Sequence, residues 1–435
     1  MVDLIDTAYV KLWGKVIGAV SWIKEKEYAV FEFEKEILKL GLDISPLHMP
    51  LQKALQGDMI FSFPSLNKET FHGLPGLLAD SLPDKFGNTL IDAWLARNGR
   101  DPNSFSPIER LCYIGKRGMG ALEFSPSLAT NTEDSVPVEI ADLVRLAQEV
   151  SSEHFRLNAN ISDNNNTEAM LDIIRVGTSA GGARPKAVVA VNADGHVRSG
   201  QVKAPAGYDY WIIKFDGVDD LELGKTQGYG RIEYAYHLMA KACGINMTPC
   251  RLLEEGGRAH FMTKRFDRDK NTKVHLQSLC GLAHYDFNLA GGYSYEQVFS
   301  VMRQLHLPKT EAHQQFCRMV LNVVARNQDD HTKNISFLLD SKGKWHLSPA
   351  YDFIYAHNPA GHWTNKHQMT INGKREGFTL QDLVEVGDSI GLPNPKETIM
   401  EIIDTVKHWP KFAQEAGVRQ ETIERIKQYH RYLDN

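Results

Sequence analysis

The stretch of residues 321–352, LNVVARNQDDHTKNISFLLDSKGKWHLSPAYD, constrains this chain more than any other. Its apolar start is typical of the end of a helix. The alternating residues 335–339 and 345–347, on either side of a Gly-containing turn, predict a hairpin. We therefore expect a helix, a polar catalytic loop, a hairpin and then a metal-binding acid.

The polar side chains of this stretch have the order that phosphoryl transfer needs. Asp329 and Asn334 stand five positions apart, with His331 and Lys333 between them, and Asp352 follows the hairpin. Phosphoryl transfer leaves little covalent work for the protein. One carboxylate accepts the hydroxyl proton, while an amide and a second carboxylate hold magnesium. The alternative is that these Asp and Asn residues only form turns, and the spacing alone does not exclude it.

The composition is that of an ordinary globular protein with more than one domain. The 435 residues exceed the usual size of one domain, and the net charge of -5 gives no global case for nucleic-acid binding. The cysteines are scattered without a C-x-x-C pair, which argues for a reducing compartment and against a cysteine zinc site. Neither a membrane-spanning apolar run nor a signal-peptide pattern occurs, so we expect a cytoplasmic protein.

The N-terminal part predicts a small sheet followed by a helix. Apolar and polar residues alternate over 8–20 and 28–33, and residues 77–95 carry apolar side chains at helical spacing. Pro83 marks a helix start there rather than an interior position. The Gly-rich residues 115–124 predict a tight turn that enters a strand, with a phosphate loop as the weaker alternative.

A second informative stretch is RVGTSAGGARPKAVVAV, residues 175–191. A loop of small residues, 177–183, is followed by Arg184 and Lys186 and then by an apolar strand. Glycines allow backbone amides to approach phosphate oxygens closely, and the two basic residues add positive charge. A flexible hairpin turn explains the same residues equally well.

A strand lysine and a helix glutamate follow. Lys214 lies among bulky apolar residues of the predicted strand 210–215, where a kinase lysine for nucleotide phosphates would sit. The alternative is an edge-strand lysine that reaches solvent. Glu233, near the start of a predicted helix 231–243, either pairs with Lys214 or is a favourable first-turn acid. After a strand at 259–265, RFDR at 265–268 is expected to cross between two lobes.

These motifs together make the chain resemble the HipA toxin kinases of bacterial toxin-antitoxin pairs. The resemblance covers VKLWGKVIGAV and GLLADSLPD near the N-terminus, and TSAGGARPK, YWIIKF, IEYAYHLMAKACGI, KRFDR, DDHTKN and SPAYDF further on. It implies a serine/threonine protein kinase that uses ATP and Mg²⁺. It also implies a DNA-binding antitoxin of the HipB type as partner and makes an aminoacyl-tRNA synthetase a plausible substrate.

The resemblance assigns roles to individual positions. Asp329 becomes the catalytic base, and Asn334 and Asp352 become magnesium ligands. The residues implied at the nucleotide are Gly181, Gly182, Ala183, Arg184, Pro185, Lys186, Lys214, Glu233, Lys264, Arg265, Phe266, His331, Thr332, Lys333, Asn334, Tyr351 and Asp352. Two departures matter: Asp330 replaces a small residue, which leaves Asp330 as an alternative base, and Arg184-Pro185 replaces a polar pair before Lys186.

Ser179 aligns with the serine that this family autophosphorylates. A phosphate there adds nearly two negative charges where the loop must hold the phosphates of ATP. We therefore expect phosphorylated Ser179 to leave the pocket and switch the enzyme off. The alternative is that Ser179 only satisfies hydrogen bonds of a turn.

The C-terminal third has mostly helical periodicity. The clearer predicted helices are residues 296–305, 311–324, 380–386, 397–409 and 420–433. His357, His362 and His367 recur every five residues, which does not align them on one helix face. We interpret them as exposed loop histidines, with zinc as the weaker alternative.

We predict an α+β, two-lobed, protein-kinase-like fold with a β-rich N-terminal subdomain and a helical C-terminal lobe. The expected domains are 1–125, a nucleotide-binding lobe at 126–263 and a helical lobe with the catalytic loop at 264–435. The favoured function is ATP-dependent phosphorylation of a protein serine or threonine. The alternatives are a kinase-fold partner of a DNA-binding repressor, with dispensable chemistry, and a small-molecule kinase.

Overall fold

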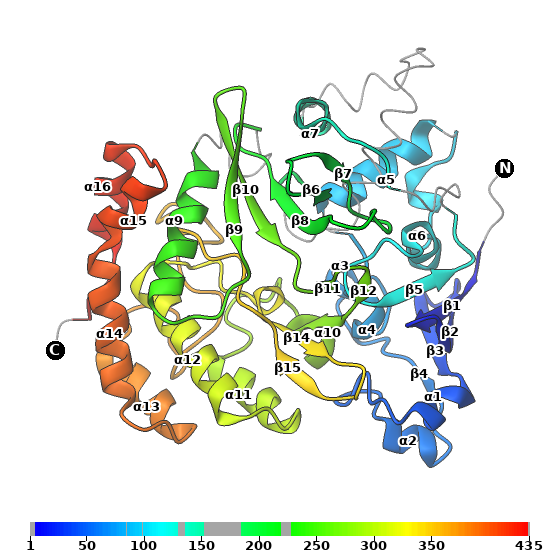
Figure 1. Cartoon of the computed structure of the whole chain (residues 1–435). Helices are drawn as coiled ribbons and strands as arrows, with labels where there is room; N and C mark the ends of the chain where they lie inside the picture. Colours follow the sequence, from blue (N-terminus) through cyan, green and yellow to red (C-terminus); the bar gives the residue numbers. More distant parts are fainter. Residues whose placement is uncertain are drawn as a thin grey trace. The chain divides into compact units, whose positions relative to one another are not determined.

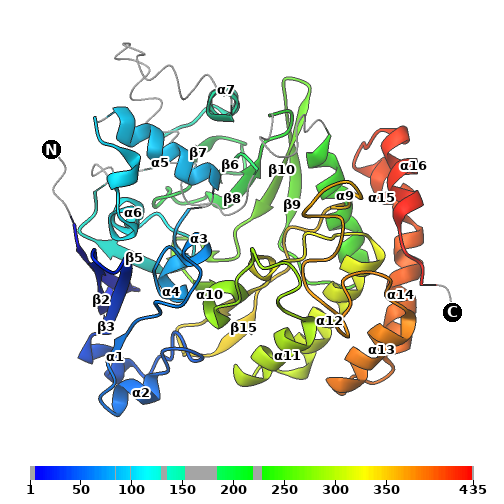
Figure 2. The ribbon, with the colours of Figure 1, turned by 180° about the vertical axis from the view of Figure 1, so that it is seen from behind.

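The computed structural model describes residues 5–83, 85–97, 99–128, 135–151, 184–218 and 228–433 (Figures 1 and 2). Contacts divide the chain into two compact units. Unit 1 consists of Met1–Gln227, Leu253–Leu276 and Ser341–Gly343, and unit 2 of Gly228–Leu252, Gln277–Asp340 and Lys344–Asn435. Neither unit is one continuous stretch of sequence.

The first sheet of unit 1 has the strand order β4-β3-β2-β1-β5 (Figure 1). In β1, alternation buries Ala8, Val10 and Leu12 while Thr7 and Tyr9 are exposed. The sheet predicted from residues 8–20 and 28–33 is confirmed, as is the strand after the turn at 115–124. The strands are β1 (Thr7–Leu12), β2 (Lys15–Ile23), β3 (Tyr28–Phe33), β4 (Ile60–Phe61) and β5 (Leu122–Ser125).

The helix predicted over 77–95 forms as two separate helices. Pro83 lies between them, two residues before the second begins, and its carbonyl accepts a hydrogen bond from Asn88 Nδ2 (3.0 Å). The prediction that Pro83 marks a helix start is confirmed. The helices described in unit 1 are α1 (Lys35–Leu40), α2 (Leu51–Leu55), α3 (Lys68–Phe71), α4 (Gly76–Ala79), α5 (Lys85–Arg97), α6 (Pro107–Ile114) and α7 (Ile140–Ser151).

The second sheet has the order β7-β6-β8-β10-β9. All six residues of β6 are buried, as the apolar run after the small-residue loop suggests. The strand β8 is central, because β6 and β10 pair with it on either side, both antiparallel. The strands are β6 (Lys186–Val191), β7 (Val197–Ser199), β8 (Asp209–Lys214), β9 (Cys250–Glu255) and β10 (Arg258–Lys264).

A buried ion cluster occupies the RFDR motif after β10. Asp267 accepts two hydrogen bonds from Arg265 (2.8 and 2.7 Å), one from Arg268 (2.8 Å) and one from the backbone of Gly120 (2.7 Å). Burial raises the pKa of Asp267, but the two guanidinium groups and these donors outweigh burial and leave it well below its usual value.

The expected crossing between lobes at 265–268 is therefore wrong. The ion cluster holds these residues within unit 1, where β11 (Arg268–Asp269) and β12 (Thr272–Lys273) form a small hairpin. The chain, which has already passed through unit 2 at Gly228–Leu252, returns to unit 2 only after Leu276.

Unit 2 is mainly helical. Ten consecutive residues of α12 are buried, so this helix forms the centre of the core of unit 2. Figure 2 shows α11 and α14 beside α12. The described helices are α9 (Tyr229–Ala242), α10 (Leu279–Ala283), α11 (Tyr295–Gln304), α12 (Lys309–Val324), α13 (Leu380–Ser389), α14 (Pro395–Lys407), α15 (Trp409–Glu415) and α16 (Gln420–Tyr429).

The helix starts in unit 2 follow from their capping residues. Ser294 and Thr379 each accept a hydrogen bond from the backbone three residues later, and Gln297 and Asp382 return one. The predicted C-terminal helices are confirmed with small shifts, except that the helix predicted to Leu433 ends at Tyr429. Among the residues that the structure describes, none of the helices is both long and apolar enough to span a membrane.

The predicted hairpin after the catalytic loop is also confirmed. The strands β14 (Ser336–Leu339) and β15 (Trp345–Leu347) pair antiparallel, with Phe337 opposite Leu347. They belong to a three-stranded sheet whose remaining strand is β13 (His275–Ser278).

Candidate active site

The candidate catalytic loop begins where α12 ends. Ala325 caps α12, and its carbonyl accepts a hydrogen bond from the buried hydroxyl of Tyr236 in α9 (2.5 Å). Arg326 adopts a left-handed backbone conformation (φ 58°), and its Nε donates to the carbonyl of Tyr429 at the end of α16 (2.7 Å). Contacts with two helices thus hold the first residues of the loop.

Asp329 presents its carboxylate at the surface of the loop, with 39% of the side chain exposed. Its Oδ1 accepts a hydrogen bond from the indole Nε1 of Trp363 (2.6 Å), and His331 Nε2 lies 3.8 Å from the same oxygen. Within the described part of the chain, Oδ2 has no hydrogen-bond partner. The backbone carbonyl of Asp329 accepts a hydrogen bond from Asn334 Nδ2 (2.7 Å), which closes the loop on itself.

Asp330, in contrast, is buried and fully engaged. Its Oδ2 accepts hydrogen bonds from the hydroxyl of Tyr295 and from Nδ1 of His367 (2.8 Å each), and its Oδ1 accepts one from the backbone of Gln368 (2.7 Å). Burial raises the pKa of Asp330, but His367 and the hydrogen bonds from Gln368 and Tyr295 lower it below its usual value. This geometry supports Asp329, not Asp330, as the group available to a substrate.

Asn334 and Asp352 line one open depression of about 330 Å³. Because Asn334 Nδ2 is bound to the carbonyl of Asp329, its Oδ1 is left as an acceptor. Asp352 has a left-handed backbone (φ 55°), which Asp tolerates better than most residues, and its carbonyl accepts from Asn327 Nδ2 (3.3 Å). Oxygen donors of this kind suit magnesium, so the residues present fit that ion.

The other residues assigned to the nucleotide in this loop have separate contacts. Thr332 is buried and donates its hydroxyl to the carbonyl of Tyr285 (2.7 Å). Lys333 places Nζ 4.5 Å from the ring centroid of Phe287. The hydroxyl of Tyr351 donates to the Lys333 carbonyl (2.6 Å). Thr332 and Tyr351 therefore support the shape of the loop.

The two candidate phosphate lysines of unit 1 are neighbours across the second sheet. Lys186 in β6 lies directly opposite Lys214 in β8, so both side chains lie on one face of the sheet. Lys186 is buried, and Lys214 Nζ lies 5.8 Å from the ring centroid of Phe261. The edge-strand interpretation of Lys214 is wrong, because β8 is the central strand.

Lys264, Arg265 and Phe266, also assigned to the nucleotide, lie at the end of the same sheet and just after it. Lys264 forms an ion pair with Asp209 (2.8 Å), Arg265 is buried in the ion cluster with Asp267, and Phe266 is half-buried. The guanidinium of Arg265 is thus committed to the protein. Only Lys264 and Phe266 keep exposed side-chain surface.

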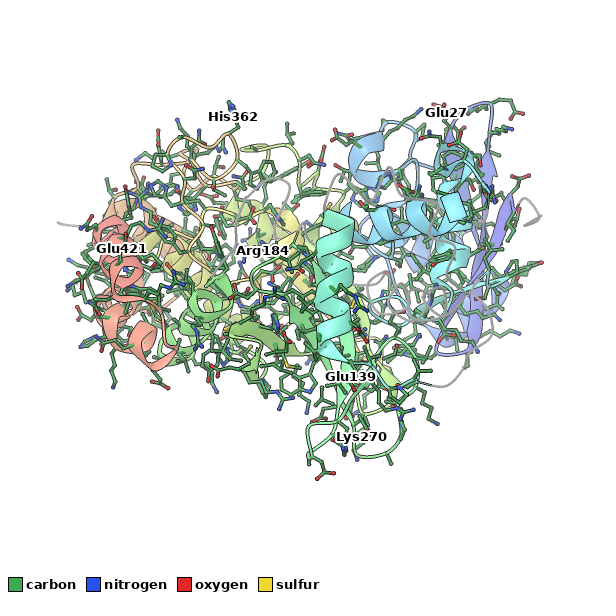
Figure 3. All side chains as sticks on the ribbon, turned by 90° about the horizontal axis from the view of Figure 1, so that it is seen from above. Glu27, Glu139, Arg184, Lys270, His362 and Glu421 are labelled. Atoms are coloured by element: carbon green, nitrogen blue, oxygen red, sulfur yellow. The ribbon has the colours of Figure 1, made fainter. Side chains whose placement is uncertain are left out.

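Part of the predicted nucleotide loop lies outside the described residues. This applies to Gly177, Ser179, Gly181, Gly182 and Ala183, while Arg184 is drawn in Figure 3. Glu233 is 2% exposed and lies in the second turn of α9, which begins at Tyr229. The interpretation of Glu233 as a first-turn acid is therefore wrong, and its pairing with Lys214 stays a prediction.

The three histidines of the loop before α13 have different environments. His362 is exposed (Figure 3), but His357 is half-buried beside Gln328, and His367 is completely buried against Asp330. The prediction of exposed loop histidines is thus confirmed for His362 and wrong for His357 and His367. Among the described residues, no group of three His, Cys, Asp or Glu side chains could hold a metal ion.

Sequence reasoning missed the contacts that the 363–368 segment makes with the catalytic loop. Trp363 lies 34 positions after Asp329, and His367 lies 37 positions after Asp330. No motif links them to the loop. The only local signals were a lone Trp and the last of three histidines that recur every five residues.

Comparisons with known proteins cover most of the chain. A model of the HipA N-terminal domain matches residues 8–125, and a model of the HipA-like C-terminal domain matches residues 178–430. The search of curated proteins found no match.

Among solved structures, the chain is similar to HipA of Shewanella oneidensis MR-1, determined in a complex with HipB and its operator DNA. The identity is 17%, the TM-score is 0.67, and the match covers 97% of this chain and 95% of that chain. The likeness shows a shared fold. The Helicobacter pylori proinflammatory kinase CtkA matches with 14% identity and a TM-score of 0.31, over 51% of this chain and 90% of that chain.

Proposed function

The chain belongs to the HipA family, and from this premise we propose that it is a serine/threonine protein kinase that transfers the γ-phosphate of ATP to a protein hydroxyl. We further propose that it acts as the toxin of a HipA/HipB-type toxin-antitoxin pair. The expected partner is a DNA-binding antitoxin of the HipB type, because the Shewanella HipA was determined in a complex with HipB and DNA.

The observation that carries the proposal is the environment of Asp329. One carboxylate oxygen is held by Trp363, and the other is open in the described structure. A base needs this arrangement, since it must accept a proton from a hydroxyl that arrives from solvent. A partner protein whose chemistry is dispensable has no need for an oriented and exposed carboxylate.

Asn334 and Asp352 are the proposed magnesium ligands. When bound, Mg²⁺ neutralises charge on the phosphates and orients them. Asn334 contributes an amide oxygen whose orientation is set by the carbonyl of Asp329, and Asp352 contributes a carboxylate beside the same depression. Lys186 and Lys214 are the proposed cations for the ATP phosphates in unit 1, together with Arg184.

The test is phosphotransfer by the purified full-length protein with Mg-ATP. Intact-mass analysis and a phosphoproteomic comparison of a lysate are expected to show phosphorylated serine or threonine with the wild type and none with Asp329→Ala. Asp388→Asn, which alters an exposed carboxylate of α13 in the same unit, is the matched control and keeps full activity. Phosphorylation of small molecules without any phosphoprotein would favour the small-molecule kinase instead.

We also propose that Ser179 is the site of an inhibitory autophosphorylation. After incubation with Mg-ATP, one added phosphate is expected to map to Ser179 and to be absent from the Asp329→Ala protein. The Ser179→Ala variant should then remain active for longer than the wild type. An unmodified Ser179 in an active enzyme would exclude this switch.

A further inference from the structure

The segment 363–368, WTNKHQ, contacts both adjacent carboxylates of the catalytic loop. Its first residue, Trp363, donates to Asp329, and its last two residues, His367 and Gln368, donate to Asp330. A single short segment therefore touches the exposed carboxylate from one end and the buried one from the other.

The inner end of the segment is rigidly built. His367 and Asp330 are both buried, and their side chains lie 2.8 Å apart. The Gln368 side chain donates to the carbonyls of Gln328 (3.3 Å) and Trp363 (2.5 Å). These bonds fold the segment onto the residue that precedes Asp329.

The rest of the fold holds the segment as well. The backbone amide of His367 donates to the carbonyl of Arg375 (3.1 Å), and Arg375 Nε donates back to the carbonyl of His367 (2.6 Å). The carbonyl of Gln368 accepts from the amide of Gly291 (2.8 Å) just before α11. The position of Trp363 is thus set by contacts that do not involve the exposed carboxylate.

From these contacts we propose that Trp363 is a positioning residue for the phosphotransfer, and this inference rests on the proposed kinase function. Its indole N–H occupies Oδ1 of Asp329, which fixes the rotation of the carboxylate and leaves Oδ2 for the proton of the acceptor hydroxyl. The bond is charge-assisted and therefore stronger than a neutral one. The pair Asp330–His367 anchors the segment from which Trp363 acts.

A positioning role makes a specific kinetic prediction. Without the indole N–H, the carboxylate can rotate, so the reacting oxygen is correctly placed for less of the time. We expect Trp363→Phe, which keeps an aromatic ring, to lower kcat by about 10- to 100-fold. The KM for ATP should stay within about 2-fold of the wild-type value, because the substitution leaves Asn334, Asp352 and the lysines of unit 1 unchanged.

Trp13→Phe is the matched control. Trp13 is also half-buried, and its indole also donates a hydrogen bond, to the carbonyl of Lys273 (2.8 Å), but it lies in unit 1. It should leave kcat unchanged. The proposal is overturned if kcat is unchanged in Trp363→Phe. It is also overturned if Trp13→Phe lowers kcat as much as Trp363→Phe does.

A second readout does not depend on kinase activity. In ¹⁵N-labelled full-length protein, the indole resonance that disappears in Trp363→Phe belongs to Trp363, and the one that disappears in Trp13→Phe belongs to Trp13. Asp329→Ala is expected to move the Trp363 resonance upfield and to leave that of Trp13 in place. An unmoved Trp363 resonance would refute the contact itself. If it moves but the wild type transfers no phosphate, the kinase proposal fails and the positioning role fails with it, while the contact stands.

Discussion

At the scale of single residues, the most informative feature is the pair of adjacent carboxylates in the catalytic loop. Asp329 and Asp330 are chemically identical and neighbours in sequence, yet one is 39% exposed and the other is buried with three donors. Their surroundings, and not their chemistry, separate a candidate base from a structural anchor. Substitution by Asn should therefore lower activity with little effect on stability at Asp329, and should lower stability at Asp330.

Asp329→Asn is expected to lower phosphotransfer by about 10²- to 10⁴-fold, because it removes the proposed general base. It should change the free energy of unfolding by less than about 0.5 kcal/mol, since the side chain is partly exposed. Steady-state kinetics and urea unfolding measure the two effects. The comparison is made under conditions where both variants are folded. If Asp330→Asn then loses activity while Asp329→Asn retains it, Asp330 is the base.

Asp330→Asn is expected to destabilise the protein by about 3–5 kcal/mol at pH 7, because it leaves His367 buried without its charged partner. The pKa of Asp330 is lowered in the folded state. Its stabilising effect is therefore present above the ordinary value of 3.8 and is lost as the pH falls below it. Urea unfolding of wild type and variant at pH 5 and 3.5 should show a difference in the free energy of unfolding that is smaller at pH 3.5.

Lys186→Met and Lys214→Met are expected to weaken ATP binding by about 10-fold or more, because each removes a cation proposed to contact a phosphate. Calorimetry in the Asp329→Asn background measures binding without turnover. Lys203→Met, at an exposed position of the same unit, is the control and should bind ATP like the parent. If all three variants bind ATP with equal affinity, the assignment of Lys186 and Lys214 to the ATP phosphates is excluded.

At the scale of elements, the hairpin β11–β12 shows how buried charge holds unit 1 together. Lys273 in β12 forms an ion pair with Glu123 of β5 (2.9 Å) and donates to the carbonyl of Lys116 (2.5 Å). Burial and then the charge of Arg268 lower the pKa of Lys273, Glu123 opposes both, and the net value is about 8. The contact therefore depends on pH.

Between pH 8 and about 10, the unfolded chain binds a proton at Lys273 that the folded chain releases. The stability contributed by this lysine consequently rises with pH in that window. The free energy of unfolding of the wild type, relative to that of Lys273→Met, should rise by on the order of 1–3 kcal/mol from pH 7 to 10, because each pKa unit corresponds to about 1.4 kcal/mol. Guanidinium unfolding at both pH values measures this. A difference between wild type and Lys273→Met that stays constant with pH would contradict this prediction.

At the scale of the whole molecule, the chain forms two units that each contain part of the proposed machinery. The sheet with Lys186 and Lys214 belongs to unit 1, and the loop with Asp329, Asn334 and Asp352 belongs to unit 2. The chain passes between the units several times, so neither set of residues can be removed by a simple truncation. Function must be tested on the full chain.

If the protein is a toxin, its expression should arrest the growth of a bacterial host, and this arrest should require the chemistry. We expect Asp329→Asn to abolish growth arrest at equal protein level, and Asp388→Asn to preserve it. Co-expression with a HipB-type protein from the same genome should restore growth and yield a complex on purification. Arrest by the Asp329→Asn protein would favour a binding role in which catalysis is dispensable.

The sequence by itself determined the elements, because their signals are local. Alternation identified the strands β1 to β3, helical spacing identified α11, α12, α13, α14 and α16, and the D-x-x-x-x-N spacing indicated the candidate catalytic loop. Side-chain periodicity within an element depends only on near neighbours in the chain. The same holds for Pro83, whose fixed backbone angle is a property of one residue.

The tertiary structure alone decided which groups of the loop face solvent. The burial of Asp330 depends on His367 and Tyr295, and the orientation of Asp329 depends on Trp363, all more than 30 positions away in sequence. The same is true of Lys214, whose central strand is defined by pairing with β6 and β10. Two adjacent aspartates have the same local pattern, so only the packing of distant side chains around them separates a candidate base from an anchor.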